Sequence, residues 1–593
     1  MSRYPGRRHV RWQPTSIGST DTPKTSVIDT STPLLKRQPY YPILQVFSQL
    51  DEVTTTISIV SISDGVGSNI NENYLGALAA QLHVESLDDK DAEDYLVLLR
   101  SLEAVLRSID NAPDYIAPDL LPQKTLEDRI FWQPASKDNP FNGWSHQCDI
   151  KSASPTSKLL GGRTVAVKDN ISVAGLPTTL GLHQSLFPEG NGYPISPIDA
   201  VVVSRILEAG GIIKGTSTCE SFCASPLSFT SATGPVHNPL LHNYTAGGSS
   251  SSSAVLVAAH QLASRGGFSP SGQTVELAIG TDQAGSPTFG LVPYTGAGSM
   301  SPMIDHMGPL EAELEDVAVL LEVMAGYDGY DPRMTPETPL VHRVKPYLKL
   351  LLQARQEIQS KLNPGHKLRV GLLKESFHIP GVAADVRDIV YQTATRYFEA
   401  IGACVVEVSI PMHQEGPAIW TAATRPSMSS YLCEGNPSGH LSFLSPHAQT
   451  KWPPSQETQP IWLEAKAHRM VFALRAAYDS ALEHLDVLIT PCAPTVAMIH
   501  PDPNGPDGRR ASVLDRLDVA VGLTRNTCPF NVTGHPALNV PRGFSTAECH
   551  PDVPLPVGTQ IVTRRWADEQ LIEAAALFER GREVLKTTVD GRK

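Results

Sequence analysis

Long hydrophobic runs are missing from this sequence. In its 593 residues no apolar stretch approaches the roughly 18 residues that a membrane-spanning helix needs. The first twenty residues lack the apolar core of a secretory signal, and their arginines leave an organelle transit peptide only as a minor alternative, because Pro5 and Gly6 would interrupt its helix. We therefore expect a cytoplasmic protein without a membrane span.

An excess of positive charge and closely paired cysteines are also missing. Lys and Arg total 48 against 61 Asp and Glu, a net charge of −13, which argues against binding nucleic acid or an anionic membrane through the overall field. The eight cysteines form no CxxC pair in this long chain. Reduced thiols are therefore expected in preference to a disulfide framework or a zinc ribbon.

The familiar catalytic and cofactor motifs are absent as well. The sequence contains no GxSxG, no HExxH, no GxxxxGK[ST] phosphate loop and no GxGxxG after a strand. His237 and His242 lie five residues apart in a proline-containing loop, which is weak evidence for a metal. We expect no metal and no cofactor, and a serine hydrolase with a lysine base is the route that remains.

The composition is that of an ordinary globular protein, 41% hydrophobic and 18% charged. Residue composition and apolar periodicity change along the chain. Residues 1–36 are rich in Ser, Thr, Pro and Arg and are predicted to be a disordered tail. Residues 37–149 are predicted to be a helical region, because apolar residues recur at spacings of three and four between Asp88 and Ile109. We interpret this layer as packing, with a lid and a homodimer surface as alternatives.

From residue 150 onward, strands and helices alternate. Strands are predicted over 163–167, 212–214, 368–373, 404–410, 486–490 and 557–563, and helices over 199–209, 385–401 and 568–585, with Asp199 as the expected cap of the first helix. This alternation predicts an α/β fold: one large domain over 150–593 with a mixed sheet between helices.

Three junctions rich in small residues depart from the packing pattern. Lys168 ends a β-branched run, a serine run follows Gly247 and Gly248, and Ser286 ends the segment 278–286. Taken one at a time, the three junctions are interpreted as a solvated strand end, a linker and a turn. Backbone amides converge at such junctions and can present a side chain to a ligand, so their combination predicts a site.

In this order the three segments resemble the amidase signature family, over roughly residues 150–585. Thr233–Pro239, together with the start of the serine run at 247–250, resembles the serine-rich core of the family. Four further motifs resemble the subgroup that hydrolyses small aliphatic and aromatic carboxamides, including bacterial enantioselective amidases: Thr288–Gly296, Asp305–Leu310, Ala325–Arg333 and Pro529–Leu538. These subgroup motifs argue against the glutaminase subunit of a tRNA-dependent amidotransferase. The resemblance implies a small amide substrate and no cofactor.

The resemblance also implies a Ser–Ser–Lys triad, with Ser286 as nucleophile, Ser249 as bridging serine after a cis peptide bond, and Lys168 as base. Burial among valines favours the neutral amine, which alone can accept a proton. The amides of 283–286 would form the oxyanion hole. The residues implied to bind the oxyanion or substrate are Gln283, Ala284, Gly285 and Ser250, and His306, Tyr294 and Trp420 are candidates for lining the pocket.

The sequence departs from the family pattern in three places. Ser251 and Ser252 replace two glycines, which would strain the backbone if those positions needed positive φ. Ser249 and Ser286 are separated by 36 residues, more than the family places there, and 260–274 looks like an inserted loop. A segment expected after Ser286 is missing. These departures leave a second hypothesis open, a catalytically impaired amidase fold that acts as a binding or assembly protein.

Overall fold

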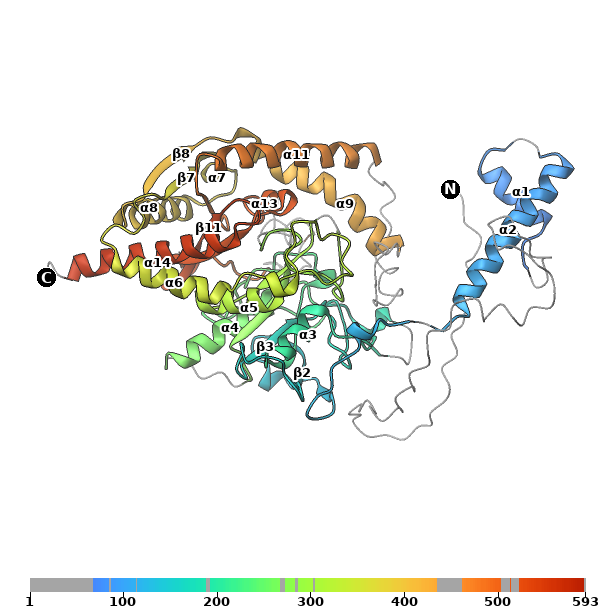
Figure 1. The fold of residues 1–593 in the computed structure, drawn as a ribbon, viewed down its shortest axis with the longest axis horizontal. Coiled ribbons are helices and arrows are strands. Elements are labelled where there is room, and N and C mark those ends of the chain that lie inside the picture. The colour runs from blue at the N-terminus through green and yellow to red at the C-terminus, as the bar shows by residue number, and fades with distance from the viewer. Residues whose placement is uncertain are drawn as a thin grey trace. The chain divides into compact units, whose positions relative to one another are not determined.

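The computed structural model describes residues 68–84, 87–113, 115–187, 192–266, 272–282, 286–301, 304–434, 461–502, 512 and 522–590. The chain divides into two compact units, with a boundary between Asp119 and Leu120 (Figure 1). Each unit is considered by itself. The predicted tail over 1–36 lies outside the described residues.

The smaller unit contains two helices, α1 (Glu72–Gln81) and α2 (Asp89–Asp110). The predicted amphipathic helix is confirmed, and the Asp88 side chain caps it by accepting a hydrogen bond from the Asp91 amide at 2.8 Å. Leu96 is buried, whereas the apolar residues of the last two turns are exposed: Leu102, Leu106 and Ile109 are 52%, 61% and 72% exposed.

The first sheet of the larger unit has six strands in the order β1-β2-β4-β3-β5-β6. They span β1 (Phe131–Trp132), β2 (Trp144–Lys151), β3 (Thr164–Lys168), β4 (Ile212–Ser217), β5 (Leu277–Asp282) and β6 (His306–Pro309). Strand β3 lies between β4 and β5 and is parallel to both, while β2 and β6 pair with their neighbours antiparallel. Strand β1 and most of β2 precede residue 150, so this sheet draws on sequence before the predicted domain start.

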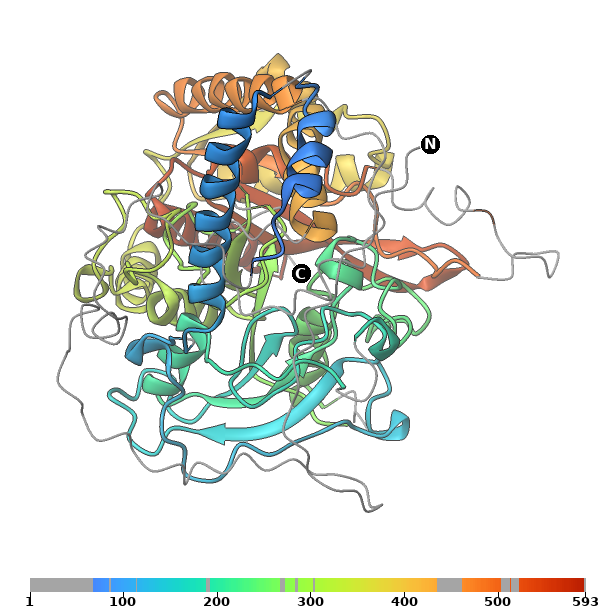
Figure 2. The same cartoon turned by 90° about the vertical axis from the view of Figure 1, so that its right-hand side faces the viewer.

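The second sheet has five strands in the order β10-β11-β9-β7-β8. They are β7 (Arg369–Leu373), β8 (Cys404–Val408), β9 (Val487–Pro491), β10 (Ala537–Ala547) and β11 (His550–Val562), and Figure 2 shows β10 and β11 as the pair of long red arrows. Strand β7 is parallel to β8 and β9, while β11 is antiparallel to β9 and β10. The α/β class with mixed strands is confirmed, and the strands form two sheets.

Helices surround these sheets and close the core. They are α3 (Val201–Glu208), α4 (Ser251–Ser264), α5 (Leu314–Met324), α6 (Tyr347–Ser360), α7 (Lys374–Phe377), α8 (Ala384–Ala400), α9 (Gly416–Glu434), α11 (Ile461–Leu482), α13 (Cys528–Thr533) and α14 (Asp568–Asp590). Helix α14 packs against α6 and α8, and α9 lies along α11 (Figure 1). One cluster of buried apolar side chains includes Val165 and Ile279 of the first sheet together with Val370 and Ile489 of the second, so the two sheets share a core.

Two local predictions were wrong. Asp199 does not cap α3, which begins after Ala200 without a side-chain cap. Its carboxylate instead accepts two hydrogen bonds from Arg129, at 2.7 and 2.6 Å, and one from the Ala174 amide, because a buried carboxylate is stabilised by a paired guanidinium. The stretch predicted as an inserted loop from 260 begins as the last turn of α4, which runs to Ser264.

No helix in the described part of the chain is both long enough and apolar enough to span a bilayer.

Candidate active site

Lys168 lies at the carboxyl end of β3 and is completely buried. Its Nζ donates to Ser249 Oγ at 2.7 Å and to the Thr281 carbonyl at 3.1 Å. Strand β3 runs parallel to β5, so its carboxyl end meets the carboxyl end of β5, where Thr281 is found. The topology thus brings together a lysine and a carbonyl that are separated by more than a hundred residues.

Ser249 lies between this lysine and the start of α4. The Gly248–Ser249 peptide bond is cis, as the resemblance implied. Gly248 has no room for a side chain, since a Cβ there would be 2.5 Å from the Ser225 carbonyl oxygen. Ser250, the next residue, donates through Oγ to the same Thr281 carbonyl at 2.9 Å. Thr281 therefore holds both Lys168 and the segment that carries Ser249.

The serine run opens α4 without the backbone strain considered above. Neither Ser251 nor Ser252 has positive φ, and both are buried in the first turn of the helix. Ser253 Oγ contacts Ser217 Oγ at 2.7 Å and donates to the Ile279 carbonyl at 3.2 Å. The run is therefore a buried helix start that is joined to β4 and β5, and not a linker.

Ser286 follows β5 after a gap in the described residues. It is 6% exposed, its carbonyl accepts a hydrogen bond from the Ala537 amide at 3.0 Å, and its Oγ lies 3.5 Å from Asp282 Oδ2. Within the described residues no hydrogen bond joins Ser286 to Ser249. The structure thus brings together Lys168, Ser249 and Ser250, and it places Ser286 beside Asp282. Gln283, Ala284 and Gly285 lie outside the described residues.

The residue after the lysine carries a buried acid. Asp169 accepts hydrogen bonds from Ser145 Oγ at 2.8 Å and from the amide and hydroxyl of Thr179. Burial raises the pKa of Asp169 to about 7, and these hydrogen bonds oppose the shift. Asp169, directly after β3, therefore anchors Ser145 and the loop that contains Thr179 beside the end of the strand.

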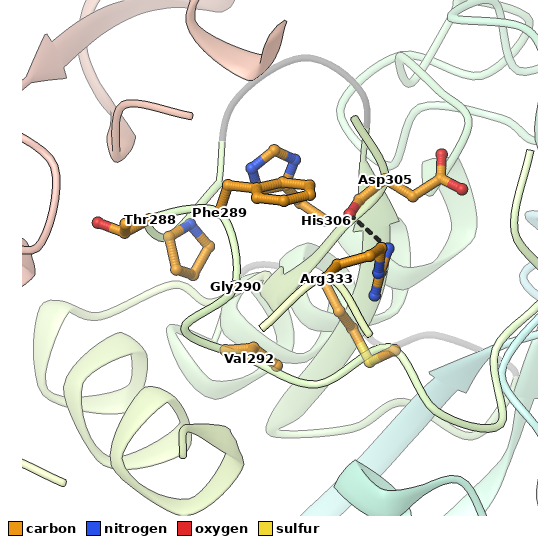
Figure 3. A pocket seen from close by; sticks show the side chains of 9 residues that line it. Thr288, Phe289, Gly290, Val292, Asp305, His306 and Arg333 are labelled. Atoms are coloured by element: carbon orange, nitrogen blue, oxygen red, sulfur yellow. Dashed lines mark hydrogen bonds between the residues drawn. The ribbon is translucent and has the colours of Figure 1, made fainter. Parts of the chain in front are cut away.

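A pocket of about 220 Å³, counting space open to solvent, lies beside the Ser286 segment (Figure 3). It is lined by Pro287, Thr288, Phe289, Gly290, Val292, Asp305, His306, Met307 and Arg333. Of the three candidate lining residues, His306 lines it, whereas Tyr294 is buried behind it under the Arg333 guanidinium, 4.4 Å from the ring centre. Trp420 of α9 is not among the lining residues.

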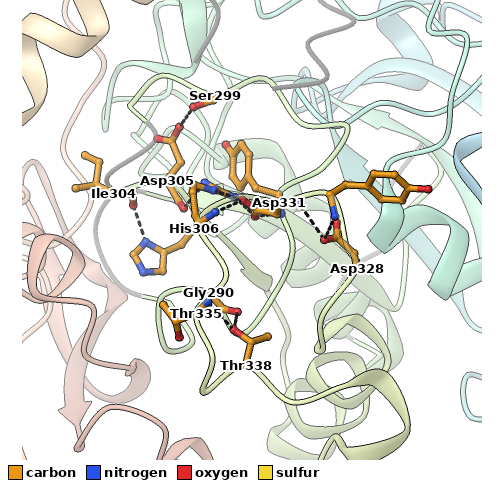
Figure 4. A network of polar contacts seen from close by, with 12 residues as sticks. Gly290, Ser299, Ile304, Asp305, His306, Asp328, Asp331, Thr335 and Thr338 are labelled. Carbon is orange, nitrogen blue, oxygen red and sulfur yellow. Dashed lines mark hydrogen bonds and ion pairs between the residues drawn. The ribbon is translucent and has the colours of Figure 1, made fainter. Parts of the chain in front are cut away.

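The walls of the pocket are held by a polar network (Figure 4). Arg333 donates to both carboxylate oxygens of Asp331, at 2.8 and 2.6 Å, and to the Asp305 carbonyl at 3.1 Å. The Asp305 carboxylate accepts from Ser299 Oγ and from the Met300 and Ser301 amides. Arg333 and Asp331 thus form an ion pair, and the Asp305 carboxylate is held by hydrogen bonds from neutral groups.

Metal ligands do not gather in the described part of the chain, where no group of three or more His, Cys, Asp or Glu side chains could hold an ion. His237 and His242 stack ring on ring with centroids 3.8 Å apart. Burial lowers the pKa of His237 to about 4, and the neighbouring His242 adds to the shift.

The two mixed sheets flanked by helices define an α/β protein, and the lysine–serine pair lies at the end of a central strand of its first sheet. A model of the amidase family matches residues 144–572. The chain belongs to the amidase signature family.

Individual relatives agree with this assignment. The chain is 34% identical over 483 residues to an enantioselective amidase from Rhodococcus rhodochrous, with 76% of this chain and 85% of the relative covered. It is 26% identical to a glutamyl-tRNA(Gln) amidotransferase subunit of Prochlorococcus marinus, covering 72% and 86%. Its fold is similar to that of a bacterial aryl acylamidase, with a TM-score of 0.55 at 20% identity over 72% of this chain and 84% of the other.

Some residues of the site were missed by the sequence reasoning. Thr281 acts through its carbonyl, which no residue type reveals, and Asp282 lies within the segment 278–286 but was given no predicted role. The register of β5 against β6 pairs Asp282 with His306, and Thr281 with Met307. Asp282 could have been noticed in the sequence because it ends an apolar run shortly before Ser286.

Proposed function

We propose that this protein is an amidase that hydrolyses a small carboxamide to the carboxylic acid and ammonia through an acyl-enzyme on Ser286. The observation that carries the proposal is the 2.7 Å contact between Lys168 Nζ and Ser249 Oγ at the end of β3. A serine hydroxyl needs a base to become a nucleophile, and the amine of a lysine that contacts a second serine can serve as that base. Family membership and the 34% identical amidase support the reaction class.

Each residue is assigned one role in the proposed mechanism. The Lys168 amine takes the proton of Ser249, Ser249 takes that of Ser286, and the Ser286 alkoxide attacks the amide carbon. The proton returns through Ser249 to the leaving nitrogen, so that ammonia departs and an ester remains on Ser286. Water then repeats the sequence and releases the acid. The structure has the Ser286 hydroxyl beside Asp282, so the mechanism requires this hydroxyl to turn toward Ser249 before the proton is transferred.

A second candidate is a catalytically impaired amidase fold that serves binding or assembly. The observation that favours it is the contact of Ser286 with Asp282 in place of Ser249, next to the shortened segment that follows. A third reading, an amidotransferase glutaminase subunit, has less support, since the relative of that kind is 26% identical against 34% for the amidase. The cytoplasmic location and the homodimer stay predictions.

Ammonia release separates the first two candidates. Propionamide, benzamide and phenylacetamide are offered to the purified wild type and to Ser286→Ala. We expect release by the wild type and a loss of at least about a thousandfold in the variant, because removing the nucleophile of a serine hydrolase removes most of its catalysis. A folded wild type that releases no ammonia from any amide would contradict the amidase proposal and favour the impaired fold.

A further inference from the structure

Two cysteines lie beside each other in the turn that follows β4. Cys219 and Cys223 are free thiols that are 0% and 7% exposed, and Cys223 Sγ lies 3.5 Å from Cys219 Sγ. A disulfide bond holds its sulfur atoms about 2.0 Å apart, so a movement of roughly 1.5 Å would bring this pair to bonding distance. We call residues 219–223 the cysteine turn. Its two thiols are therefore placed to react with each other.

The cysteine turn contacts the segment that carries Ser249. The amide of Glu220, the residue after Cys219, donates to the Ser249 carbonyl at 3.5 Å. The hydrogen bond from Cys223 and burial hold the pKa of Cys219 well above its usual range, and the positive charge of the nearby Lys168 opposes the shift. The cysteine pair therefore lies in the immediate surroundings of the lysine–serine pair, although neither thiol takes part in the proposed mechanism.

The backbone of the cysteine turn has little freedom to absorb a movement. Phe222 and Cys223 have φ angles of 51° and 58°, in the left-handed region that residues with side chains rarely adopt. The Phe222 amide donates to the Leu180 carbonyl at 2.8 Å, and a Cβ on Gly181 would be 2.4 Å from the Cys219 carbonyl oxygen. Because the loop at 180–181 holds one side of the turn, a movement of the two sulfur atoms is passed to the side that contacts the serine segment.

We propose that Cys219 and Cys223 form a disulfide bond when a peroxide oxidises them, and that this bond lowers the amidase activity by displacing the cysteine turn from Ser249. The effect on activity rests on the proposed function, whereas the bond itself does not. Disulfides in a reducing compartment are usually transient and regulatory, which is consistent with the free thiols of this pair. Hydrogen peroxide is a small neutral oxidant, which suits a pair that is almost completely buried.

The oxidation consumes two thiols and one peroxide. The Cys223 thiolate, from the more exposed of the two residues, attacks one oxygen of hydrogen peroxide and breaks the O–O bond. The departing hydroxide takes up the proton of that thiol as water, and a sulfenic acid remains on Cys223. The Cys219 thiolate then attacks the Cys223 sulfur, and the second hydroxide leaves as water with the second thiol proton. The pair thus loses two electrons, which reduce the peroxide to two waters, and a thiol reductant reverses the change.

Peptide mass spectrometry and ammonia release test the proposal on the full chain. The folded protein is treated with hydrogen peroxide, unfolded in the presence of iodoacetamide and digested with trypsin, which leaves both cysteines, and no other, in the peptide 215–265. We expect this peptide to be two hydrogens lighter than its reduced form and not alkylated. Ammonia release by the treated enzyme should fall by about a hundredfold, a factor that a displacement of about 1 Å can cost. Dithiothreitol should restore the activity.

Two variants separate this pair from the other thiols. In Cys219→Ser, peroxide should leave ammonia release at the variant's own untreated rate, whereas Cys404→Ser, which removes an exposed thiol of β8, should respond to peroxide as the wild type does. A peptide 215–265 with both thiols alkylated after peroxide has oxidised Cys404 overturns the inference, and so does a disulfide that leaves the rate unchanged.

The measurements on the wild type decide alone if Cys219→Ser does not fold. A folded wild type that releases no ammonia from any amide, before or after dithiothreitol, would overturn the proposed function and with it the effect on activity. The mass of the peptide would still decide whether the bond forms, so the two failures are distinguishable.

Discussion

At the scale of residues, the site depends on how closely the backbone of β5 approaches the serine segment. Gly280 precedes Thr281, whose carbonyl holds Lys168 and Ser250. A Cβ at Gly280 would lie 2.6 Å from Ser250 Oγ and 2.4 Å from Leu310 Cδ1. The absence of a side chain at this position therefore allows Ser250, and Ser249 before it, to reach the strand.

Gly280→Ala should consequently lower the free energy of unfolding by about 1–3 kcal/mol, the usual cost of overpacking, and should lower turnover by displacing Ser250. Urea unfolding and ammonia release measure the two effects. The control is Gly76→Ala in α1, where a Cβ would meet nothing within 4 Å. It should be neutral or slightly stabilising. Equal stability of Gly280→Ala and the wild type would show that the approach is not tight.

Residue types predicted part of this site and could not predict the rest. Lys168 and the serine run were noticed because they lie at junctions rich in small residues, and the resemblance to the amidase signature family then selected Ser249 and Ser250. The partnership of Asp282 with His306 depends on strand register, which requires the pairing partner to be known. The role of Asp199 was wrong because its partner Arg129, seventy positions away, was not visible from the local pattern.

At the scale of elements, periodic segments were predicted well. The predicted bounds were right to within one or two residues for the strands at 368–373 and 486–490 and for the helix at 385–401. Each of these segments has a single dominant hydrophobic periodicity. Helices α9 and α11 were missed, and so was the antiparallel hairpin of β10 with β11. Pro426 within α9 argues against a helix in sequence, and packing against α11 overrides that preference.

His413 connects the short helix that follows β8 with α11 and with the segment that precedes α13. It is completely buried in the short helix that follows β8, where Nδ1 contacts Tyr478 Oη of α11 at 2.6 Å and Nε2 contacts Asn526 Oδ1 at 3.1 Å. Burial lowers the pKa of His413 from 6.5 to about 4, although Asn526 and Glu375 oppose the shift. The unfolded chain therefore binds a proton between pH 6.5 and 4 that the folded chain does not bind, so stability is lost as pH falls through this window.

We predict that His413→Gln reduces the loss of unfolding free energy between pH 7 and pH 4.5 by roughly 1–3 kcal/mol. The measurement is the free energy of unfolding in urea at pH 7 and at pH 4.5, for wild type and variant. The variant should be less stable at pH 7, because it loses packing and hydrogen bonds, but its loss between the two values should be smaller. Parallel pH curves for the two proteins would contradict the prediction.

At the scale of the whole molecule, the sequence predicted the α/β fold class but not the division of its strands between two sheets. Alternating strands and helices led to one mixed sheet, whereas the described residues form two, each of which contains three adjacent parallel strands. Local patterns specify strands, but the assignment of strands to sheets depends on long-range pairing, such as that of β2 with β4. The shared core explains how one family domain encloses both sheets.

The central claim is that Lys168 and Ser249 activate Ser286 as the acyl-accepting nucleophile. The most direct measurement is mass spectrometry of the full chain after an acid quench from p-nitrophenyl phenylacetate, since esters and amides share the tetrahedral intermediate. The account predicts one phenylacetyl group per chain, mapped by peptide digestion to Ser286, and no such adduct in Ser286→Ala or Lys168→Met. An unmodified wild-type chain that nevertheless turns over the ester, or an acyl group mapped to another residue, would contradict it.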